Sequence, residues 1–302
     1  VATEVTRKVT VTQEADTTAP VITLVGAADL AAEAGVAYTA PGATAADDRD
    51  GDLTSKVVVG GDTVDSSTPG VYNITYDISD AAGNAAVRLT RKVTVADTLS
   101  PAITLNGEAE VPVEAGVAYT DAGATAADVF EGDLTAKLAT VNPVDTSKVG
   151  EYTVTYSVSD GAGNEGVLTR KVTVADTVAP TLVLTGDAAL SHEAGSDYTD
   201  GGATATDSFE GDLTARIVKV DTVDSDKLGD YTITYNVGDT SGNNAAELKR
   251  TVTVADTTAP VLALKGSATA TVFLGKPYVD AGATAADSYE GDLSTRIILV
   301  GD

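Results

Sequence analysis

Acidic side chains recur at fixed spacing along this chain, and their chemistry is the easiest to define. Three carboxylates stand at positions i, i+3 and i+5 of a short segment, and a glycine precedes the last of them. Carboxylate oxygens on a glycine-bent loop can converge on one hard cation, and Ca²⁺ takes six to eight oxygen ligands. Three side chains are too few, so other segments must add oxygens. The sets are Asp47, Asp50 and Asp52; Asp128, Glu131 and Asp133; Asp207, Glu210 and Asp212; and Asp287, Glu290 and Asp292.

Two further motifs carry oxygen-bearing side chains in the same rhythm. An aspartate begins each Asp-Thr-x-x-Pro segment: Asp16, Asp97, Asp176 and Asp256. An Asp-x-x-Gly-Asn segment supplies Asp80 and Asn84, Asp160 and Asn164, and Asp239 and Asn243. All of these residues are candidate metal ligands together with the acidic loops. Asp, Asn and Gly also form turns that are closed by their own side-chain hydrogen bonds, so a purely structural interpretation stays open.

The motifs keep step because the chain is a tandem array. The Asp-Thr-x-x-Pro segment ends at Pro20, Pro101, Pro180 and Pro260, which gives periods of 81, 79 and 80 residues. A unit of this length can hold its own hydrophobic core. We predict the last strand of a preceding repeat at 1–15, full repeats at 16–96, 97–175 and 176–255, and the first four strands of another at 256–302. The array either continues beyond this segment, or neighbouring chains complete the partial repeats.

The strands of one repeat follow from its alternation and turn residues. No segment has a helical period, and turn formers separate short β-like runs. Tyr152, Val154, Tyr156 and Val158 alternate with hydroxyl residues and mark the strongest strand. The predicted strands are 102–105, 110–114, 124–127, 136–140, a weak one at 144–146, 152–159 and 167–174. The chain is therefore expected to be all-β, with each repeat a two-sheet antiparallel sandwich.

The expected topology decides where the acidic loop lies. Asn106-Gly107 is typical of a hairpin turn, so the first and third strands should both run away from the linker. The acidic loop would then lie at the far end of its repeat. There it would meet the next linker aspartate and the Asp-x-x-Gly-Asn loop of the following repeat. Phe130, Phe209 and Tyr289 would pack against that next domain, and the scheme depends on the weak strand at 144–146.

Composition excludes several functions. The formal net charge is −26, from 45 acidic and 19 basic residues, so nucleic acid and anionic membranes are unlikely partners. No run of 18 apolar residues occurs, so no membrane insertion is expected. Without cysteine there is no disulfide or zinc-thiolate site. With His192 as the single histidine, nucleophilic triads have no foothold. Paired carboxylates could cleave glycosides, but the same set recurs in small domains without a cleft. We predict no catalytic residues and no enzyme.

Three further residue types have structural interpretations. Tyr72, Tyr152 and Tyr231 follow a glycine by two positions, as a corner tyrosine would, with the hydroxyl on backbone. Arg7, Arg91, Arg170 and Arg250 recur in phase with core residues. We expect their stems to pack while their heads reach solvent, and an ion pair with a loop carboxylate is the alternative. His192 has apolar counterparts in the other repeats, which indicates a half-buried strand position rather than a ligand.

As a set, several motifs resemble one known family. They are Asp-Thr-Thr-Ala-Pro at 16–20 and 256–260, Glu-Ala-Gly-x-x-Tyr-Thr at 114–120, Gly-Ala-Thr-Ala-x-Asp at 123–128, Glu-Gly-Asp-Leu at 131–134, and Ser-Asp-x-Ala-Gly-Asn at 79–84 and 159–164. The chain is similar to the immunoglobulin-like tandem repeats of large bacterial surface and adhesin proteins, which are related in pattern to hyalin repeats. The resemblance implies immunoglobulin-like sandwiches in a linear rod, an extracellular location and use as a spacer or adhesive stalk. It also implies calcium at domain junctions. Phe273-Leu274-Gly275 departs from the Glu-Ala-Gly pattern.

Three functions follow as hypotheses. The first is a non-catalytic extracellular stalk or adhesin extender, whose junctions Ca²⁺ makes rigid; its partners are the neighbouring repeats. The second is an adhesive module that binds a glycan or a host protein, although only 5% of the residues are aromatic. The third is a self-assembling filament in which incomplete ends exchange strands between chains.

Overall fold

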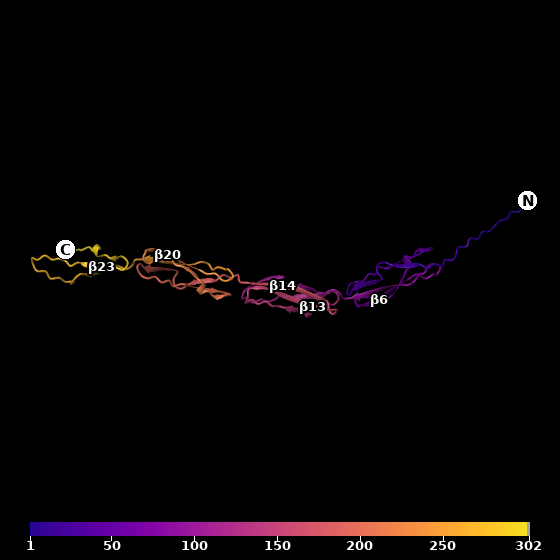
Figure 1. Ribbon diagram of the computed structural model, residues 1–302, viewed down its shortest axis with the longest axis horizontal. Coiled ribbons are helices and arrows are strands. Elements are labelled where there is room, and N and C mark those ends of the chain that lie inside the picture. Colours follow the sequence, from indigo (N-terminus) through magenta and orange to yellow (C-terminus); the bar gives the residue numbers. More distant parts are fainter. Residues whose placement is uncertain (301–302) are drawn as a thin grey trace. The chain divides into compact units, whose positions relative to one another are not determined.

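The computed structural model describes residues 1–300; residues 301–302, the end of the predicted fourth repeat, lie outside the described part. Within that part, regular structure consists of β-strands, several of which are labelled in Figure 1, and four single-turn 3-10 helices. None of these helices is long and apolar enough to cross a membrane. Two compact units are distinguished. The first contains Val1–Val111, Thr120–Val144 and Glu151–Val172, and the second contains Pro112–Tyr119, Asp145–Gly150 and the chain from Thr173 onward.

Each repeat has the same elements in the same order. Repeat 1 contains β1 (Val21–Leu24), β2 (Asp29–Glu33), β3 (Ala43–Asp47), β4 (Gly51–Asp52), η1 (Thr54–Lys56), β5 (Val58–Gly61), β6 (Gly70–Asp77) and β7 (Leu89–Ala96). Repeat 2 contains β8 (Ala102–Leu105), β9 (Glu110–Glu114), β10 (Ala124–Asp128), β11 (Gly132–Asp133), η2 (Thr135–Lys137), β12 (Ala139–Val141), β13 (Gly150–Ser159) and β14 (Glu165–Ala175).

Repeats 3 and 4 show the same order of elements over their described residues. Repeat 3 contains β15 (Thr181–Leu184), β16 (Ala189–Glu193), β17 (Ala203–Asp207), β18 (Gly211–Asp212), η3 (Thr214–Arg216), β19 (Val218–Val220), β20 (Gly229–Asn236) and β21 (Leu248–Ala255). The described part of repeat 4 contains β22 (Val261–Leu264), β23 (Ala283–Asp287), β24 (Gly291–Asp292) and η4 (Ser294–Arg296).

Two sheets form each full repeat. In repeat 1 the orders are β1-β3-β4 and β2-β7-β6-β5. Every pair in these two sheets is antiparallel except β2 with β7, which is parallel and places Leu30 opposite Val93. The first two strands therefore run in the same direction. Between them the chain changes sheet at a bend where Gly26 has a φ of +82°, a conformation that side chains with a Cβ rarely adopt.

This topology corrects the predicted strand directions. The Asn106-Gly107 segment is a bend between sheets rather than a hairpin, because β8 pairs with β10 and β9 joins the other sheet. The weak strand predicted at 144–146 is absent, and β12 follows a 3-10 turn instead. β1 follows the linker and runs away from it. Because β3 pairs antiparallel with β1, the third strand returns toward the linker. The acidic loop therefore lies at the linker end of its own repeat, opposite to the expectation.

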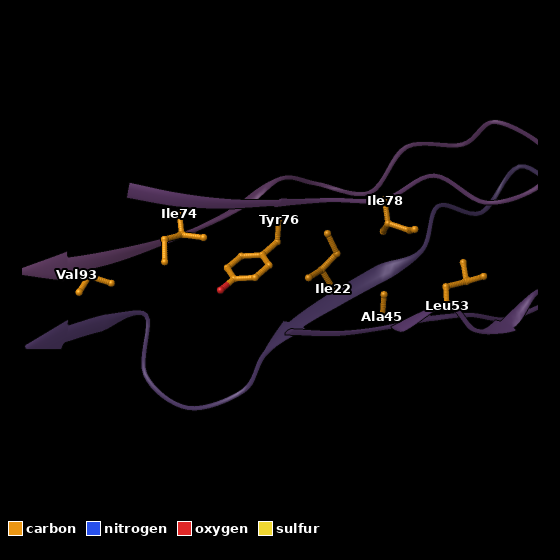
Figure 2. Close-up of a cluster of buried hydrophobic side chains, with 7 residues drawn as sticks. All are labelled: Ile22, Ala45, Leu53, Ile74, Tyr76, Ile78 and Val93. Atoms are coloured by element: carbon orange, nitrogen blue, oxygen red, sulfur yellow. The ribbon is translucent and has the colours of Figure 1, made fainter. Parts of the chain in front are cut away.

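The core of each sandwich lies between its sheets. In Figure 2 the side chains of Ile74 and Tyr76 on β6, and of Ile78 directly after it, face Ile22 and Ala45 of the other layer. Alternation along β6 explains this, since residues two apart share a face of a strand. Leu53 and Val93 complete the buried cluster. Such side chains contribute about 1.5–3 kcal/mol each when fully buried, so each repeat carries its own source of stability.

The corner tyrosines Tyr72 and Tyr231 are as predicted, and two of the arginines follow the alternative, an ion pair with a loop carboxylate. The Tyr72 hydroxyl donates to the Thr68 carbonyl oxygen at 2.7 Å, and Tyr231 does the same to Lys227 at 2.9 Å. Arg91, Arg170 and Arg250 were expected to reach solvent, but each is at most 1% exposed. Backbone carbonyls and a tyrosine hydroxyl receive their N–H groups, so the guanidinium head stays inside.

Candidate metal centres

Acidic side chains gather where a linker enters a repeat. Within each group one carboxylate oxygen of every member lies within 4.8 Å of the others. The three groups are Asp16, Asp47 and Asp48; Asp97, Glu131 and Asp160; and Asp176, Glu210 and Asp239. The expected juxtaposition of linker, acidic loop and Asp-x-x-Gly-Asn loop therefore occurs. All three elements nevertheless belong to one repeat, whereas the acidic loop was expected to meet the linker of the next repeat.

The first aspartate of the acidic loop uses its two oxygens differently. Asp128 Oδ1 accepts hydrogen bonds from the backbone N–H groups of Phe130 at 2.7 Å and Glu131 at 2.9 Å. Its Oδ2 is buried and has no hydrogen-bond partner among the described residues. Asp47, Asp207 and Asp287 repeat this arrangement. One oxygen closes the turn that the structural interpretation required, and the other remains available as a ligand.

The linker aspartates also carry buried oxygens without a partner. They are Asp97 Oδ2, Asp176 Oδ1 and Asp256 Oδ1. Desolvation raises the pKa of Asp97, and the negative charges of Asp128, Asp160, Glu33 and Glu131 raise it further. Desolvation likewise raises the pKa of Asp176 and Asp256, with Asp207 and Asp287 as the nearest repelling charges. A proton or another cation at these positions would therefore relieve an unfavourable charge.

The second acidic residue of the loop fastens the neighbouring loop. Asp50 Oδ2 accepts from the Ala81 backbone N–H at 2.6 Å, and Glu131 Oε1 accepts from that of Gly161. Glu210 makes the equivalent bond to Thr240. Its other oxygen pairs with Arg216 Nη1 at 2.7 Å, as Glu131 pairs with Lys137 Nζ at 3.0 Å. A basic residue thus shares part of the charge in these loops.

The Asp-x-x-Gly-Asn loop fixes the linker backbone. Asp160 Oδ2 accepts from Asn164 Nδ2 at 2.8 Å, and the same amide donates to the Asp97 carbonyl oxygen at 3.3 Å. The pairs Asp80 with Asn84 and Asp239 with Asn243 do the same to Asp16 and Asp176. Hydrogen bonds from Asn164 and Gly163 lower the pKa of Asp160, although desolvation opposes them. The asparagine amide nitrogens therefore hold the linker in place.

The last acidic residue of each loop has another role. Asp133 Oδ1 accepts from the Thr135 backbone N–H at 2.9 Å, where it caps the 3-10 turn, and these bonds lower its pKa. Asp52 and Asp212 make the same contact with Thr54 and Thr214. None of the three belongs to the acidic groups of the described residues. The i+5 carboxylate of the predicted set is a turn cap.

The sequence interpretation missed a glutamate from the preceding repeat. Glu33, at the end of β2, accepts from the Thr98 N–H at 2.7 Å and from its hydroxyl at 2.6 Å. Glu114 and Glu193 bind Thr177 and Thr257 in the same way. These bonds lower the pKa of all three, that of Glu193 to about 2. The signal was present, because this glutamate belongs to the recurring Glu-Ala-Gly motif.

The glycine of each Glu-Ala-Gly motif contacts the acidic loop of the following repeat at or beside the aromatic residue of that loop. A Cβ on Gly35 would lie 2.8 Å from the Val129 carbonyl oxygen and 3.0 Å from Phe130 Cα. A Cβ on Gly116 would lie 3.6 Å from Phe209 Cδ2, and Gly195 faces Ser288 and Tyr289. Phe130, Phe209 and Tyr289 therefore contact the preceding repeat, not the following one as expected. The reversed direction of the third strand accounts for the difference.

The donor set fits a hard divalent cation. At the entry to repeat 2 the ligand atoms on offer are carboxylate oxygens of Asp97, Asp128, Glu131 and Asp160, with Glu33 nearby. The chain has no cysteine, and its single histidine contacts Ser196 and makes an edge-to-face contact with the Tyr198 ring within repeat 3. Oxygen-only sites suit Ca²⁺, Mg²⁺ or Mn²⁺ rather than zinc or copper. Buried, unpartnered oxygens are the structural observation that points to an ion.

The fold defines the class of protein: an all-β chain of tandem immunoglobulin-like sandwiches. Sequence comparison then identifies its family. A model described as "Bacterial surface protein, Ig-like domain" matches residues 22–95, 103–174 and 182–254, so the chain belongs to this family. The three matched segments fall within the three full repeats described above.

Similar proteins come from distant organisms. The chain is 34% identical over 211 residues to the pesticidal crystal protein Cry22Aa of Bacillus thuringiensis, covering 67% of this chain and 28% of that protein. It is 28% identical over 310 residues to hyalin of Strongylocentrotus purpuratus, covering 97% of this chain and 25% of hyalin. The chain thus spans about a quarter of the length of each. The protocadherin GammaB4 extracellular domain aligns with a TM-score of 0.32 at 11% identity, over 91% of this chain and 56% of that one.

Proposed function

We propose that this chain is a non-catalytic extracellular spacer, part of a stalk or an adhesin extender, whose repeat junctions bind Ca²⁺. Membership of a bacterial surface protein family and similarity to hyalin support the location. Its immediate partners are its own neighbouring repeats. The proposal rests chiefly on one observation: among the described residues, buried carboxylate oxygens without a hydrogen-bond partner recur in all four acidic loops and in the linkers that begin at Asp97, Asp176 and Asp256.

Calcium would act on the linker. Asp97 belongs to the linker, Asp128, Glu131 and Asp160 belong to repeat 2, and Glu33 belongs to repeat 1. An ion held by oxygens of several of these segments would restrict their relative motion, because each displacement would lengthen a metal–oxygen bond. Extracellular calcium modules have dissociation constants of about 10⁻⁴–10⁻³ M. At a hundredfold excess over that constant, one site contributes about 2.7 kcal/mol of stability.

Binding is tested by paired substitutions at one junction. Asp97→Asn removes a linker charge from the group, whereas Asp133→Asn removes a charge of equal sign from the neighbouring turn cap. We expect calorimetric titration of the metal-free chain to show one site fewer, or one weakened at least tenfold, for Asp97→Asn only. Equal titration curves for Asp97→Asn and the unmodified chain would remove the metal from the proposal.

Stiffening is tested separately by small-angle scattering. The full chain is measured with 5 mM calcium and with excess chelator, at the same ionic strength. We expect a broader distribution of dimensions with chelator, and the same broadening for Asp97→Asn in calcium. Scattering curves that coincide with and without calcium, in a chain that demonstrably binds it, would leave a plain spacer without a metal-controlled hinge.

A further inference from the structure

Each full repeat has one buried arginine. In repeats 2 and 3 a carboxylate pairs with it, and the arginine of repeat 1 has neutral contacts instead. In repeat 2, Arg170 Nη1 forms an ion pair with Asp121, and the Tyr156 hydroxyl donates to the same carboxylate at 2.8 Å. In repeat 3, Arg250 pairs with Asp200, to which the Tyr235 hydroxyl donates at 2.7 Å. Lys219 adds a second cation, with its Nζ 3.4 Å from Asp200 Oδ2. Each carboxylate therefore neutralises a buried guanidinium.

Repeat 1 lacks this carboxylate. The segment Tyr119-Thr120-Asp121-Ala122-Gly123 corresponds to Tyr38-Thr39-Ala40-Pro41-Gly42, so alanine stands where the other repeats have aspartate. Arg91 is 0% exposed, yet no described carboxylate forms an ion pair with it. Its neutral contacts are the carbonyl oxygens of Val25 at 2.6 Å and Ala27 at 3.1 Å, and the Tyr76 hydroxyl at 3.3 Å. The charge is buried without compensation by an anion of the protein.

Arginine cannot relieve this situation by losing its proton, because the guanidinium group stays protonated in proteins. A buried charge without a counter-charge is costly. Carbonyl dipoles reduce that cost, but Arg170 and Arg250 have equivalent carbonyl contacts in addition to their carboxylates. The difference between the repeats is therefore one negative charge, and solvent anions are the available substitute.

Donors in repeat 1 face the position of the missing carboxylate. The Tyr76 hydroxyl oxygen accepts a hydrogen bond from Arg91, so its O–H proton can be donated to another group. Tyr156 and Tyr235 donate theirs to Asp121 and Asp200. Figure 2 shows the Tyr76 hydroxyl directed across the core toward the opposite layer. The buried Tyr38 hydroxyl has no hydrogen-bond partner among residues 1–300. Its equivalent in repeat 3, Tyr198, also has a buried hydroxyl without a hydrogen-bond partner among these residues although Asp200 is present, so this feature is common to both repeats.

We propose that repeat 1 binds a small monovalent anion, chloride under ordinary conditions, where the Asp121 carboxylate lies in repeat 2. Arg91 Nη1–H and the Tyr76 O–H are its donors, as Arg170 and Tyr156 are to Asp121. Ala40 and Pro41 are exposed, so the site lies beneath a surface loop. The chain's net charge of −26 disfavours phosphate, sulfate and other polyanions. The site is separate from the acidic groups at the junctions.

Anomalous scattering tests occupancy directly. Crystals of the full chain grown in bromide should show an anomalous peak beside Arg91 and Tyr76 in repeat 1. Repeats 2 and 3 are internal controls, because their aspartates already occupy the equivalent position, and no peak is expected beside Arg170 or Arg250. Density for water alone beside Arg91 in high bromide would overturn the proposal.

Thermal unfolding of the full chain tests the energetics without crystals. Chloride or bromide at tenfold excess over its dissociation constant should raise one melting transition by about 5–10 °C relative to gluconate at equal ionic strength. Ala40→Asp should abolish the halide dependence of that transition and raise its temperature in gluconate. The reciprocal Asp200→Ala should create halide dependence in repeat 3. A halide effect that survives Ala40→Asp unchanged would show general salt action and exclude the site.

Discussion

The protonation state of the Asp97 carboxyl group affects the free energy of unfolding at the junction. One of its oxygens is buried without a partner among the described residues, and desolvation and nearby carboxylates raise its pKa. Protonation therefore favours the folded state at this residue. In metal-free solution its contribution is most favourable below its ordinary pKa of 3.8 and is lost as the pH rises through the raised value. Asp176 and Asp256 behave in the same way.

This sign gives a pH prediction. In chelator, lowering the pH from 7 to just above 4.5 should raise the melting temperature, because the linker aspartates take up protons. Glu33 and Glu193, whose pKa values are lowered, weaken folding only below their ordinary value of 4.5. With saturating calcium the same change should lower the melting temperature, since protons compete with the ion. Calorimetric scans decide this, and a pH dependence of one sign in both buffers would contradict it.

The corner tyrosine gives a prediction that is independent of metal. Tyr72→Phe removes hydrogen bonds to the carbonyl oxygens of Thr68 at 2.7 Å and Asp65 at 3.1 Å while the ring stays in place. We expect a loss of about 0.5–1.5 kcal/mol, or about 4–8 °C per kcal/mol for a domain of this size. Tyr231→Phe should behave alike in repeat 3. Chemical denaturation would contradict the role if both variants unfold as the unmodified chain does.

At the scale of elements, the alternating strands could be predicted and their directions could not. β8 and β9 were predicted with their observed bounds, because alternation and flanking turn residues mark strands locally. Strand pairing is non-local. Asn106-Gly107 has the composition of a hairpin turn, but a bend that moves the chain to the other sheet uses the same positive φ at Gly107. The sequence offers no local feature that separates the two.

The candidate site was predicted in its membership more than in its assembly. Linker, acidic loop and Asp-x-x-Gly-Asn loop do meet, as the spacing of oxygen-bearing residues indicated. Asp133 and Glu33 show the limit. Asp133 lies two residues from Glu131 in the sequence but accepts from the Thr135 N–H of the following turn, whereas Glu33 is distant in sequence and reaches the linker. Arg170 forms the ion pair that was the alternative to solvent exposure, and its partners, Asp121 on a loop and Tyr156 on β13, are distant in the sequence.

The contact between Gly35 and the acidic loop gives an element-scale prediction. Gly35→Ala would place a Cβ 2.8 Å from the Val129 carbonyl oxygen, whereas Gly26→Ala, at a similar positive φ, meets nothing within 4 Å. Both substitutions carry the strain of a left-handed residue, about 1–2 kcal/mol. Only Gly35→Ala should also disturb the loop of repeat 2. Hydrogen exchange at 129–131 measures this, and equal exchange in both variants would show that the contact has no energetic role.

At the scale of the whole molecule, the excess of acidic residues governs the response to salt. With a net charge of −26, the folded chain repels itself unless cations collect near the carboxylates. At 0.1 M ionic strength the screening length is about 10 Å, so salt weakens repulsion between junction carboxylates and their more distant neighbours.

We therefore expect sodium gluconate to raise the melting temperature of the chelated chain between 0.02 M and 0.5 M. Saturating calcium should shrink this dependence, because bound divalent ions have already neutralised the junctions. Gluconate is chosen because it does not resemble the small anions proposed for repeat 1. A salt dependence that is unaltered by calcium would place the repulsion on the outer surfaces of the repeats instead.

The linker and repeat 2 supply the acidic group at the entry to repeat 2. Among the described contacts, repeat 1 adds Glu33, which binds the linker, and Gly35, which packs against Val129 and Phe130. Glu114 and Gly116 offer the same pair to the next repeat. Any copy can therefore follow any other that ends β2, β9 or β16 in this motif. Unequal recombination could lengthen or shorten such a gene by whole copies without the need to evolve a new joint each time.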